Sequence, residues 1–436
     1  MHMKTVAFVP AKGTSRRISN KNLQILDGEH LFKRKLRQLV ECTEIDEVWI
    51  DSESEEIHAL ASDLPVKHHR RDPALASNAT DGHEMFHNET KITDADIVVQ
   101  ALCTAPFIDS DLMDKALREL KDSDKTSLVT VTENKFYLWE NGKPTYGDRI
   151  PNSVDLPSHI VETMSFYAVK TRNKAHAKRY TDEAILYKID EVNAIDINNQ
   201  KDLDLARLVC AGHRSKKMQQ HNMLSKTFSS CLLSDICKEH GIEHFLGPKL
   251  RSQNGGCFLG YAKTLKLKAL EPDQRDPSKK DWEGIFGALG SYEFIQPGDV
   301  IVVSNDVPDK AYFGDLNAHF AYRQGAVGVV VDGQTRDVDR VAQLGLPLFA
   351  HGRQPDDIRY EGTLDSMNMP IEINGVAIKN NDIVFGDSDG VLVIPSDKWP
   401  LVLSEAKEAV RKEMMVKFEA TFGSDPFHVL NNVGLF

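Results

Sequence analysis

Apolar and polar positions follow two rhythms in the first half of the chain. From about residue 4 to residue 212, short apolar runs rich in valine and isoleucine alternate with longer stretches in which apolar residues recur every three or four positions. The first rhythm predicts buried strands and the second predicts amphipathic helices. Strands are expected at 6–9, 48–50, 97–101, 127–131 and 165–169, and helices at 31–40, 55–61, 110–120 and 201–209. This alternation predicts an α/β layered fold with a mainly parallel sheet.

The second half of the chain has a different pattern. A polar segment at 213–225 lacks apolar periodicity and is expected to be a linker. Beyond it we expect a helix at 228–241 and then strands punctuated by glycine, followed by a long helix at 401–418. The expected strands are 257–267, 299–304, 328–331, 346–350 and a final pair around 371–378 and 384–394. The chain is therefore expected to have two domains, at 1–212 and 226–436.

The composition of the chain indicates which kinds of binding partner to expect. The 436 residues include 53 Lys and Arg against 65 Asp and Glu, for a formal net charge of −12, so no nucleic-acid partner is expected. No apolar run is long enough to span a bilayer and no secretory leader is recognisable, which predicts a cytoplasmic protein without a membrane partner. The six cysteines form no CxxC pair and are expected to be reduced and structural.

A basic loop follows the first expected strand. Residues 9–22 read VPAKGTSRRISNKN. Ligands of open α/β sheets bind at the carboxyl ends of strands, where a glycine lets the backbone approach a phosphate and cations neutralise a triphosphate and its leaving pyrophosphate. The residues suited to this chemistry are Lys12, Gly13, Ser15, Arg16, Arg17 and Lys21. The loop matches neither a P-loop nor a dinucleotide fingerprint, so a solvated basic surface is the alternative.

A second polar cluster lies in the other half. Gly314, Asp315, Leu316 and Asn317 open an expected helix, and the strand at 328–331 leads to a neighbouring arginine and aspartate, Arg336 and Asp337. A guanidinium fork suits a carboxylate, and an aspartate suits a divalent cation. The alternative is a surface turn with an incidental ion pair.

Further segments of the first half follow the basic loop in a recognisable order. They are 71–76 (RDPALA), 96–99 (DIVV) leading to 104–106 (TAP), Glu162, and 194–198 (AIDIN) followed by Asp202 and Leu203. Together with the loop they resemble the acylneuraminate and ulosonate cytidylyltransferases, which make CMP-activated acidic sugars. The resemblance implies a Rossmann-like nucleotidyltransferase domain that uses CTP and Mg²⁺ or Mn²⁺.

The same resemblance implies roles for individual residues. Lys12, Gly13, Ser15 and Arg16 would bind the nucleotide with Asn22 and Arg71, the last two contacting the cytidine, while Lys21 and Asp196 would be catalytic and Asp196 would hold the metal. Three positions depart from the family pattern: Lys12 replaces an arginine, Asn198 replaces a second aspartate, and Leu102 replaces the glutamine of sialate enzymes. The Thr-Ala-Pro run also occurs in pseudaminate-type enzymes, which favours an ulosonic or nonulosonic acid other than plain sialic acid.

The second half has its own landmarks, at 325–328 (GAVG), 332–337 (DGQTRD), 374–376 (NGV) and 389–391 (DGV). They resemble the regulator of ribonuclease activity A family and its relatives, the class II 4-hydroxy-4-methyl-2-oxoglutarate aldolases. The resemblance implies a swivelling β/β/α-type domain in which Arg336 holds a pyruvyl carboxylate, Asp337 anchors the metal, and the 314–317 loop helps bind the keto acid. Arg340 stands where the aldolases usually have an acidic residue.

Together the resemblances imply a bifunctional fusion. The first domain would transfer CMP from CTP to an acidic 2-keto-3-deoxy sugar, releasing pyrophosphate, and the second would be a divalent-metal pyruvate aldolase or lyase acting on a related keto acid. One alternative makes the second half a non-catalytic oligomerisation or protein-binding module. Another has the first domain activate a phosphonate or other nonsugar acid. Because both families form oligomers, a homo-oligomer is expected.

Overall fold

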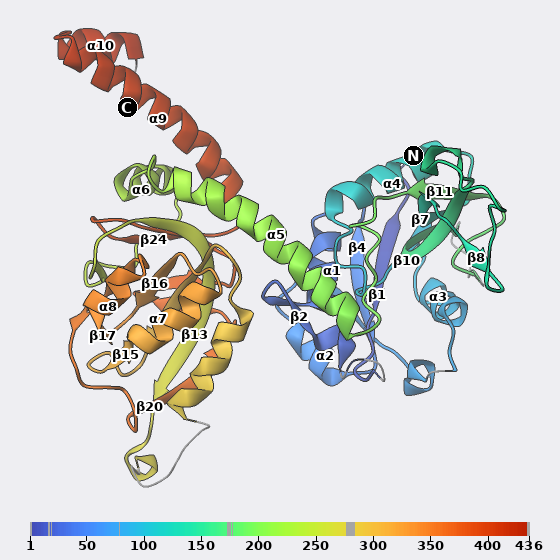
Figure 1. Cartoon of the computed structure of the whole chain (residues 1–436), viewed down its shortest axis with the longest axis horizontal. Coiled ribbons are helices and arrows are strands. Elements are labelled where there is room, and N and C mark those ends of the chain that lie inside the picture. Colours follow the sequence, from blue (N-terminus) through green and yellow to red (C-terminus); the bar gives the residue numbers. More distant parts are fainter. Residues whose placement is uncertain are drawn as a thin grey trace. The chain divides into compact units, whose positions relative to one another are not determined.

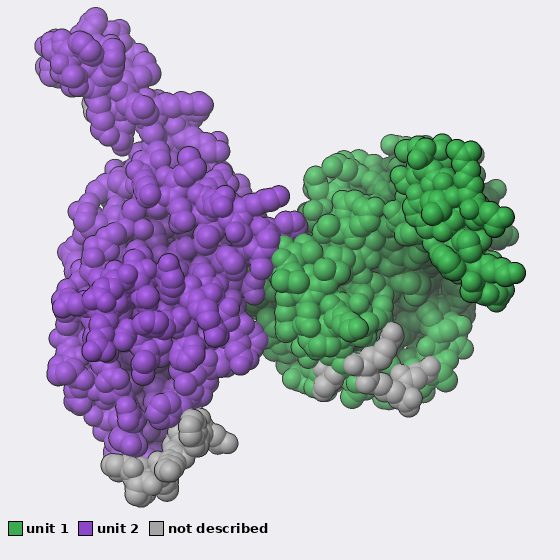
Figure 2. Space-filling view, in the orientation of Figure 1, with its two compact units in different colours: residues 1–209 green, residues 210–436 purple. Residues whose placement is uncertain are grey.

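The computed structural model describes residues 2–15, 18, 20–77, 79–171, 176, 178–275 and 284–433. The chain forms two compact units, residues 1–209 and residues 210–436 (Figure 2). Each unit has its own hydrophobic core, so each is described by itself.

Unit 1 is built on a seven-stranded sheet (Figure 1). In spatial order its strands are β11 (Ala184–Lys188), β7 (Ser127–Lys135), β10 (Ser158–Lys170), β6 (Ile97–Ala101), β1 (Thr5–Pro10), β4 (Glu47–Ser52) and β5 (Lys67–Arg70). Neighbouring strands are parallel except where β10 pairs with β6 and β7. The predicted α/β fold with a mainly parallel sheet is confirmed for this unit.

Helices cover both faces of this sheet. α1 (Leu31–Val40), α2 (Glu55–Leu60) and α4 (Ser110–Asp122) share a core with one face, and α3 (Gly82–Lys91) packs Phe86 on the other. The sequence pattern misses α3 because its residues are mostly polar. Its start depends on a capping box, in which the Asp81 carboxylate accepts hydrogen bonds from two helix amides and the Glu84 carboxylate accepts one from the Asp81 amide.

Short elements complete unit 1. They are η1 (Lys21–Leu23), β2 (Ile25–Leu26), β3 (Glu29–His30), η2 (Pro73–Ala76), β8 (Trp139–Glu140), β9 (Lys143–Pro144) and η3 (Ser153–Asp155).

Unit 2 contains one large sheet and smaller ones. The large sheet is ordered β12 (Arg251–Ser252), β18 (Leu348–Ala350), β16 (Gly328–Val331), β14 (Asp299–Asn305), β13 (Phe258–Ala269), β23 (Ile383–Gly386) and β24 (Val391–Ile394), with β20 (Gly362–Met367) also paired to β13. A parallel three-stranded sheet consists of β15 (Ala311–Phe313), β17 (Gln334–Thr335) and β19 (Gly352–Arg353). Two sheets and their helices give this unit the predicted β/β/α organisation.

After residue 225, the helices in the described part of unit 2 are α6 (Ser230–Glu239), η4 (Pro272–Gln274), η5 (Ile285–Phe294), α7 (Asp315–Arg323), α8 (Val338–Gln343), α9 (Trp399–Thr421) and α10 (Pro426–Val433). Among the residues that the structure describes, no helix is both long and apolar enough to cross a membrane.

Two ranges expected to be strands are hairpins instead. Residues 371–378 form β21 (Ile371–Ile373) and β22 (Val376–Ile378), which turn at Asn374 and Gly375 with φ angles of 51° and 80°. Positive φ at both central residues is what a tight two-residue hairpin requires. Residues 384–394 divide in the same way between β23 and β24, which pair antiparallel. Turn residues interrupt both apolar runs, and the pattern of apolar positions alone does not show that the chain reverses direction there.

The segment expected to be a linker is helical. α5 (Gln200–Leu224) begins in unit 1 and continues through residues 213–224, which belong to unit 2. Arg214 is buried there, with its guanidinium 3.2 Å from Asp299, 2.7 Å from Asn381 and 4.0 Å from the ring centre of Tyr261. Apolar periodicity is absent from this segment because its buried contacts are made by Arg214 and His221, both polar.

His221 makes the packing of α5 sensitive to acid. Its ring is buried, 5.0 Å from the ring of Tyr261 and 6.4 Å from that of Trp399. Burial, reinforced by the charges of Lys217 and Arg214, lowers the pKa of His221 to about 4. In the unfolded chain His221 therefore binds a proton below about pH 6.5, whereas in the folded chain it binds one only below about pH 4. The contribution of neutral His221 to the free energy of unfolding is complete above about pH 6.5 and is lost as the pH falls from 6.5 to 4.

We predict that His221→Phe removes part of this acid sensitivity. Between pH 6.5 and pH 4 the wild-type chain should lose about 3 kcal/mol through His221, at about 1.4 kcal/mol per pKa unit. Urea unfolding at several pH values, followed by Trp fluorescence, measures the loss. His213→Phe is the control, because His213 is exposed on the same helix. An unchanged slope in His221→Phe would contradict the prediction.

Candidate active sites

The basic loop leaves the carboxyl end of β1, between the ends of β4 and β6. The amide of Ala11 donates to the carbonyl of Asp51 at 2.9 Å, which extends the pairing of β1 with β4 by one residue. Because β1, β4 and β6 are parallel, their carboxyl ends share one edge of the sheet. Lys12, Gly13 and Ser15 lie at this edge, whereas Arg16 and Arg17 fall outside the described residues.

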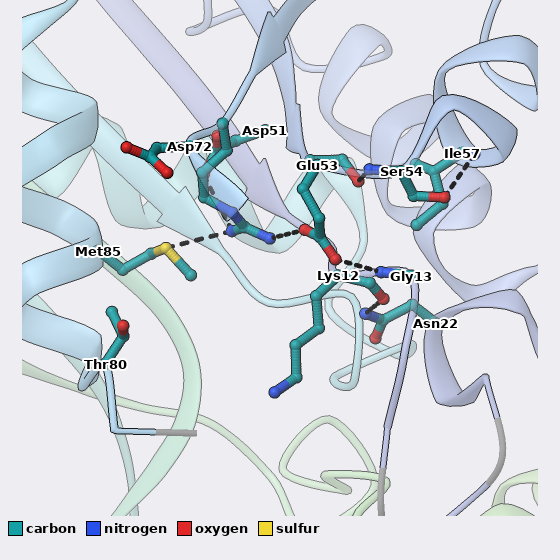
Figure 3. A network of polar contacts seen from close by, with 12 residues as sticks. Lys12, Gly13, Asn22, Asp51, Glu53, Ser54, Ile57, Asp72, Thr80 and Met85 are labelled. Carbon is teal, nitrogen blue, oxygen red and sulfur yellow. Dashed lines mark hydrogen bonds and ion pairs between the residues drawn. The ribbon is translucent and has the colours of Figure 1, made fainter. Parts of the chain in front are cut away.

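Gly13 is held against the segment that follows β4. Its amide donates to Glu53 Oε1 at 2.9 Å (Figure 3). A Cβ atom at position 13 would lie 2.8 Å from Ser54 Cβ and 3.0 Å from Ser54 Oγ. Glycine is required here for close approach of two chain segments, not for an unusual backbone angle.

Asn22 ties the two ends of the loop to β6. Its side-chain amide donates to the Lys12 carbonyl at 2.9 Å, and its Oδ1 accepts from the Cys103 thiol at 3.1 Å. Burial raises the pKa of Cys103 to about 11, so the thiol keeps the proton that this hydrogen bond needs. Lys21 and Asp196 lie close enough to Cys103 for their charges to shift the same pKa. Asn22 therefore contacts Cys103, and the charges of Lys21 and Asp196 act on the same thiol.

Asp196 has one oxygen prepared for a ligand. The side chain of Asn198 donates to Asp196 Oδ2 at 2.5 Å, while Asp196 Oδ1 is buried without a hydrogen-bond partner in the described structure. The Ile197 amide donates to the Thr104 carbonyl at 2.8 Å and fixes this segment beside the end of β6. Magnesium at nucleotide sites is commonly bound by one or two carboxylates together with substrate phosphates, so this oxygen fits a divalent cation.

Arg71 is a buried member of an ionic network. Its Nη1 lies 3.2 Å from Asp51 Oδ2, its Nη2 lies 2.7 Å from Glu53 Oε2, and none of its side-chain surface is accessible. Nη1 also donates to the sulfur of Met85 at 3.1 Å, and His69 Nδ1 lies 2.8 Å from Asp51 Oδ1. The predicted cytidine contact of Arg71 remains a prediction, and in this arrangement both terminal nitrogens of the guanidinium are engaged by the protein.

The second cluster converges in unit 2. Gly314 caps α7, and a Cβ at this position would lie 2.9 Å from Asp337 Oδ2 and 3.0 Å from Arg336 Cγ. The Arg336 amide donates to the Phe313 carbonyl at 3.0 Å, which brings the end of β17 beside the start of α7. Arg336 Nη2 is 2.8 Å from Asp357 Oδ2 and Nε is 3.8 Å from Asp337 Oδ2. Asp337 has a left-handed φ of 55°.

The rest of the 314–317 loop is divided between the site and other contacts. Asp315 lies 3.2 Å from His319 and 3.5 Å from Arg340, so two basic side chains flank it. Asn317 donates to the Tyr312 carbonyl at 3.2 Å, and 75% of Leu316 is exposed. The described residues contain no group of three or more His, Cys, Asp or Glu side chains suited to a metal. Asp337 is already beside Arg336, so a metal fits here less well than at Asp196.

Comparison with known families now identifies both halves. The family model described as Cytidylyltransferase matches residues 6–235, more than half of the chain. The chain belongs to the cytidylyltransferase family. A second family model, described as RraA-like: Aldolase/RraA, matches residues 230–393. The protein is therefore an N-terminal cytidylyltransferase domain followed by a C-terminal RraA-like/aldolase domain.

Three relatives illustrate the likeness. Protein DlpA of Legionella pneumophila is 29% identical over 45% of this chain and 31% of its own length. A putative 4-hydroxy-4-methyl-2-oxoglutarate aldolase of Halalkalibacterium halodurans is 37% identical over 26% of this chain and 53% of its own length. N-acylneuraminate cytidylyltransferase B of Danio rerio is 24% identical over 38% of this chain and 42% of its own length. The chain thus spans about half or less of each of these relatives.

The sequence analysis did not predict two carboxylates at these sites, Glu53 and Asp357. Glu53 follows the expected strand at 48–50 at the same sheet edge as the basic loop, so its position on that edge was a usable signal. Asp357 lies between β19 and β20 in a stretch without periodic pattern, and nothing in the sequence pointed to it.

We predict that Gly13→Ala lowers the stability of the cytidylyltransferase domain by about 1–3 kcal/mol, because the added methyl group overlaps Ser54. Ser54→Gly in the same chain should restore most of that loss, since it removes the atom that clashes and glycine is tolerated at an N-cap. Thermal unfolding of the single and double variants measures both effects. Gly212→Ala is the control, because a Cβ there meets nothing within 4 Å. Equal losses in the single and double variants would contradict the prediction.

Proposed function

We propose that the N-terminal domain transfers CMP from CTP to an acidic 2-keto-3-deoxy sugar of the ulosonic or nonulosonic type. The observation that carries this proposal is that hydrogen bonds attach both the basic loop, through Asn22, and the segment containing Asp196 to the residues that follow β6, Cys103 and Thr104. Family membership supports the use of CTP. The relative from Danio rerio is an N-acylneuraminate cytidylyltransferase, which supports an acidic sugar as acceptor.

The chemistry asks the protein to position reactants and to neutralise charge. A hydroxyl oxygen of the acid attacks the α-phosphorus of CTP, the bond to the bridging oxygen breaks, and pyrophosphate leaves while the hydroxyl loses its proton to solvent or base. Lys12, Ser15, Arg16 and Lys21 would bind the phosphates and offset the charge that develops on the leaving group. A divalent cation at Asp196 would supply further charge stabilisation. Asn198 orients Asp196 through its 2.5 Å hydrogen bond.

The acceptor's identity depends on the segment after β6. Leu102 cannot make the polar contact that a glutamine makes, and the 104–106 run is Thr-Ala-Pro. We therefore place pseudaminate-type and other nonulosonic acids ahead of plain sialic acid. A cytoplasmic location and a homo-oligomeric state belong to the same proposal.

The first test is pyrophosphate release from CTP and Mg²⁺ with sialic, pseudaminic, legionaminic and 3-deoxy-octulosonic acids, and with a phosphonate. Release is expected with one acidic sugar, and Asp196→Ala should reduce it by at least about 100-fold because it removes the carboxylate that fits the metal. Asp204→Ala is the control, since Asp204 is an exposed residue on the following helix. Release with the phosphonate alone would replace the sugar acid as substrate, and release unaffected by Asp196→Ala would refute the assigned site.

We further propose that the C-terminal domain cleaves a pyruvyl compound. Arg336 would bind the carboxylate of the keto acid, which would take the place of Asp357, and the loop at Gly314 would line the other side. Cleavage breaks the bond between C3 and C4 of the substrate while the C4 hydroxyl loses its proton and C4 leaves as a carbonyl compound, or as carbon dioxide when the substrate is oxaloacetate. The electron pair left on C3 forms a pyruvate enolate that then takes up a proton. A product of this type is chemically related to the acid that the first domain activates, since such acids are formally pyruvate joined to an aldehyde.

A non-catalytic second half is the competing possibility, and one observation favours it. Arg340 stands where the aldolases usually have an acid and lies 3.5 Å from Asp315. Two basic side chains, Arg340 and His319, therefore face a loop that an aldolase would use beside a metal. On this view the domain is an oligomerisation platform or a protein-binding regulator.

Pyruvate formation from oxaloacetate separates the two possibilities. If the domain is a lyase, pyruvate should form with Mg²⁺ or Mn²⁺ above the uncatalysed rate, and Arg336→Ala and Asp337→Ala should each lower the rate by at least about 100-fold. A lactate dehydrogenase coupled assay measures it. Arg353→Ala is the matched control, because Arg353 is half exposed and its nearest carboxylate is 3.7 Å away on Asp339. Rates equal to the uncatalysed reaction would support the non-catalytic module.

A further inference from the structure

The amide of Gly13 is occupied by a carboxylate of the protein itself. Gly13 N donates to Glu53 Oε1 at 2.9 Å, and the other oxygen of Glu53 accepts from Arg71 Nη2 at 2.7 Å. The Lys12 side chain extends away from this carboxylate (Figure 3). A backbone amide has one hydrogen, so in this arrangement Gly13 does not offer it to a phosphate.

Glu53 is itself held in place from the buried side. The guanidinium of Arg71 is enclosed between Glu53 and Asp51, with no accessible side-chain surface, and Asp51 is completed by His69. Burial works against ionisation of Glu53, but the hydrogen bonds from Arg71 and from the amides of Glu53 and Gly13 outweigh it and lower its pKa. Glu53 is therefore an ionised carboxylate that joins the Gly13 turn to a buried cation.

The loop is fixed at the neighbouring residue as well. The Lys12 carbonyl accepts from Asn22, and Asn22 accepts from Cys103 at the end of β6. The two attachments act on adjacent residues, one from the β4 side and one from the β6 side. They leave the Lys12 and Ser15 side chains at the sheet edge, where a triphosphate would lie.

We propose that Glu53 is a positioning residue for the triphosphate loop, and that Arg71 acts on the nucleotide through Glu53 and not by touching it. This rests on the function proposed above. A phosphate that drew Glu53 away from both Gly13 and Arg71 would leave Asp51 as the ion-pair partner of the buried guanidinium among the described residues, and loss of a partner from a buried ion pair is strongly unfavourable. The geometry thus indicates that Glu53 stays bound to the Gly13 amide, as a clamp on the loop, and is not displaced by a phosphate.

The chain supplies a matched control. Glu55, two residues further on, pairs with Arg70 at 2.7 Å, but both side chains are mostly exposed. The two glutamates have the same chemistry and similar sequence positions, and they differ in burial and in contact with the loop. Glu55→Ala should change neither the loop nor CTP binding by more than about twofold, because exposed pairs contribute little.

The test uses full-length chains carrying Glu53→Ala, Glu53→Gln, Arg71→Lys or Glu55→Ala. Amide hydrogen exchange without nucleotide reports the clamp directly: exchange in the peptide that contains Gly13 should accelerate in Glu53→Ala and stay unchanged in Glu55→Ala. Calorimetric titration with CTP and Mg²⁺ should show the Kd rising about 10-fold or more in Glu53→Ala, and less in Glu53→Gln, which retains an acceptor for the amide. Thermal unfolding confirms that each variant is folded.

The double variant Glu53→Ala with Arg71→Lys tests whether Arg71 acts through Glu53. Its Kd for CTP should be close to that of Glu53→Ala alone, because two residues acting as a unit are not additive. Additive losses would mean that Arg71 contacts the nucleotide itself. Unchanged exchange at Gly13, or tighter CTP binding in Glu53→Ala, would overturn the proposal. Failure of the wild-type chain to bind CTP would instead refute the proposed function, while exchange at Gly13 would still decide the clamp.

Discussion

The buried guanidinium of Arg71 is the interaction on which the first domain's edge depends. It joins the end of β4, through Asp51, to the loop that leaves β1, through Glu53 and the Gly13 amide. A cation without accessible surface needs partners, because an uncompensated buried charge costs several kcal/mol. Asp51 and Glu53 are these partners, and Glu53 also accepts a hydrogen bond from Gly13, which attaches the loop to the buried ion pair. The candidate triphosphate loop is therefore held from the side of β4, by an arginine whose side chain has no accessible surface.

The RraA-like/aldolase domain contains a similar pairing with a different consequence. Arg336 also faces a carboxylate of its own chain, Asp357 at 2.8 Å, but a third of the Arg336 side chain and a quarter of the Asp357 side chain are exposed. Exposed ion pairs contribute about 1 kcal/mol or less, so a substrate carboxylate can exchange with Asp357 at little cost. Burial decides the role in each case. Arg71 supports the loop, whereas Arg336 is suited to bind a ligand.

Prediction from sequence succeeded where periodicity carried the information and failed where polar contacts did. The strand at 6–9 is a continuous apolar run, and the strand at 97–101 is apolar except for Gln100. Both are buried on both faces of the sheet, and they were predicted from this apolar pattern. α3 and the second half of α5 were missed because a capping box and the polar residues Arg214 and His221 hold them. At the site, the cluster of basic residues predicted the loop. Its attachment to Glu53 was not predicted, because it depends on β1 and β4 being neighbours in the sheet, which the order of residues in the sequence does not reveal.

Two of the departures from the family patterns, Asn198 and Arg340, differ in their effect on a candidate metal site. Asn198 replaces an acid, yet its amide orients Asp196 and leaves a buried oxygen without a partner, which keeps a place for a cation. Arg340 also replaces an acid, and it brings a positive charge to within 3.5 Å of Asp315, where it opposes a cation. The first replacement removes a negative charge from a candidate metal site, and the second adds a positive charge beside one. Nucleotidyl transfer in the first half is therefore better supported by the residues present than metal-dependent cleavage in the second.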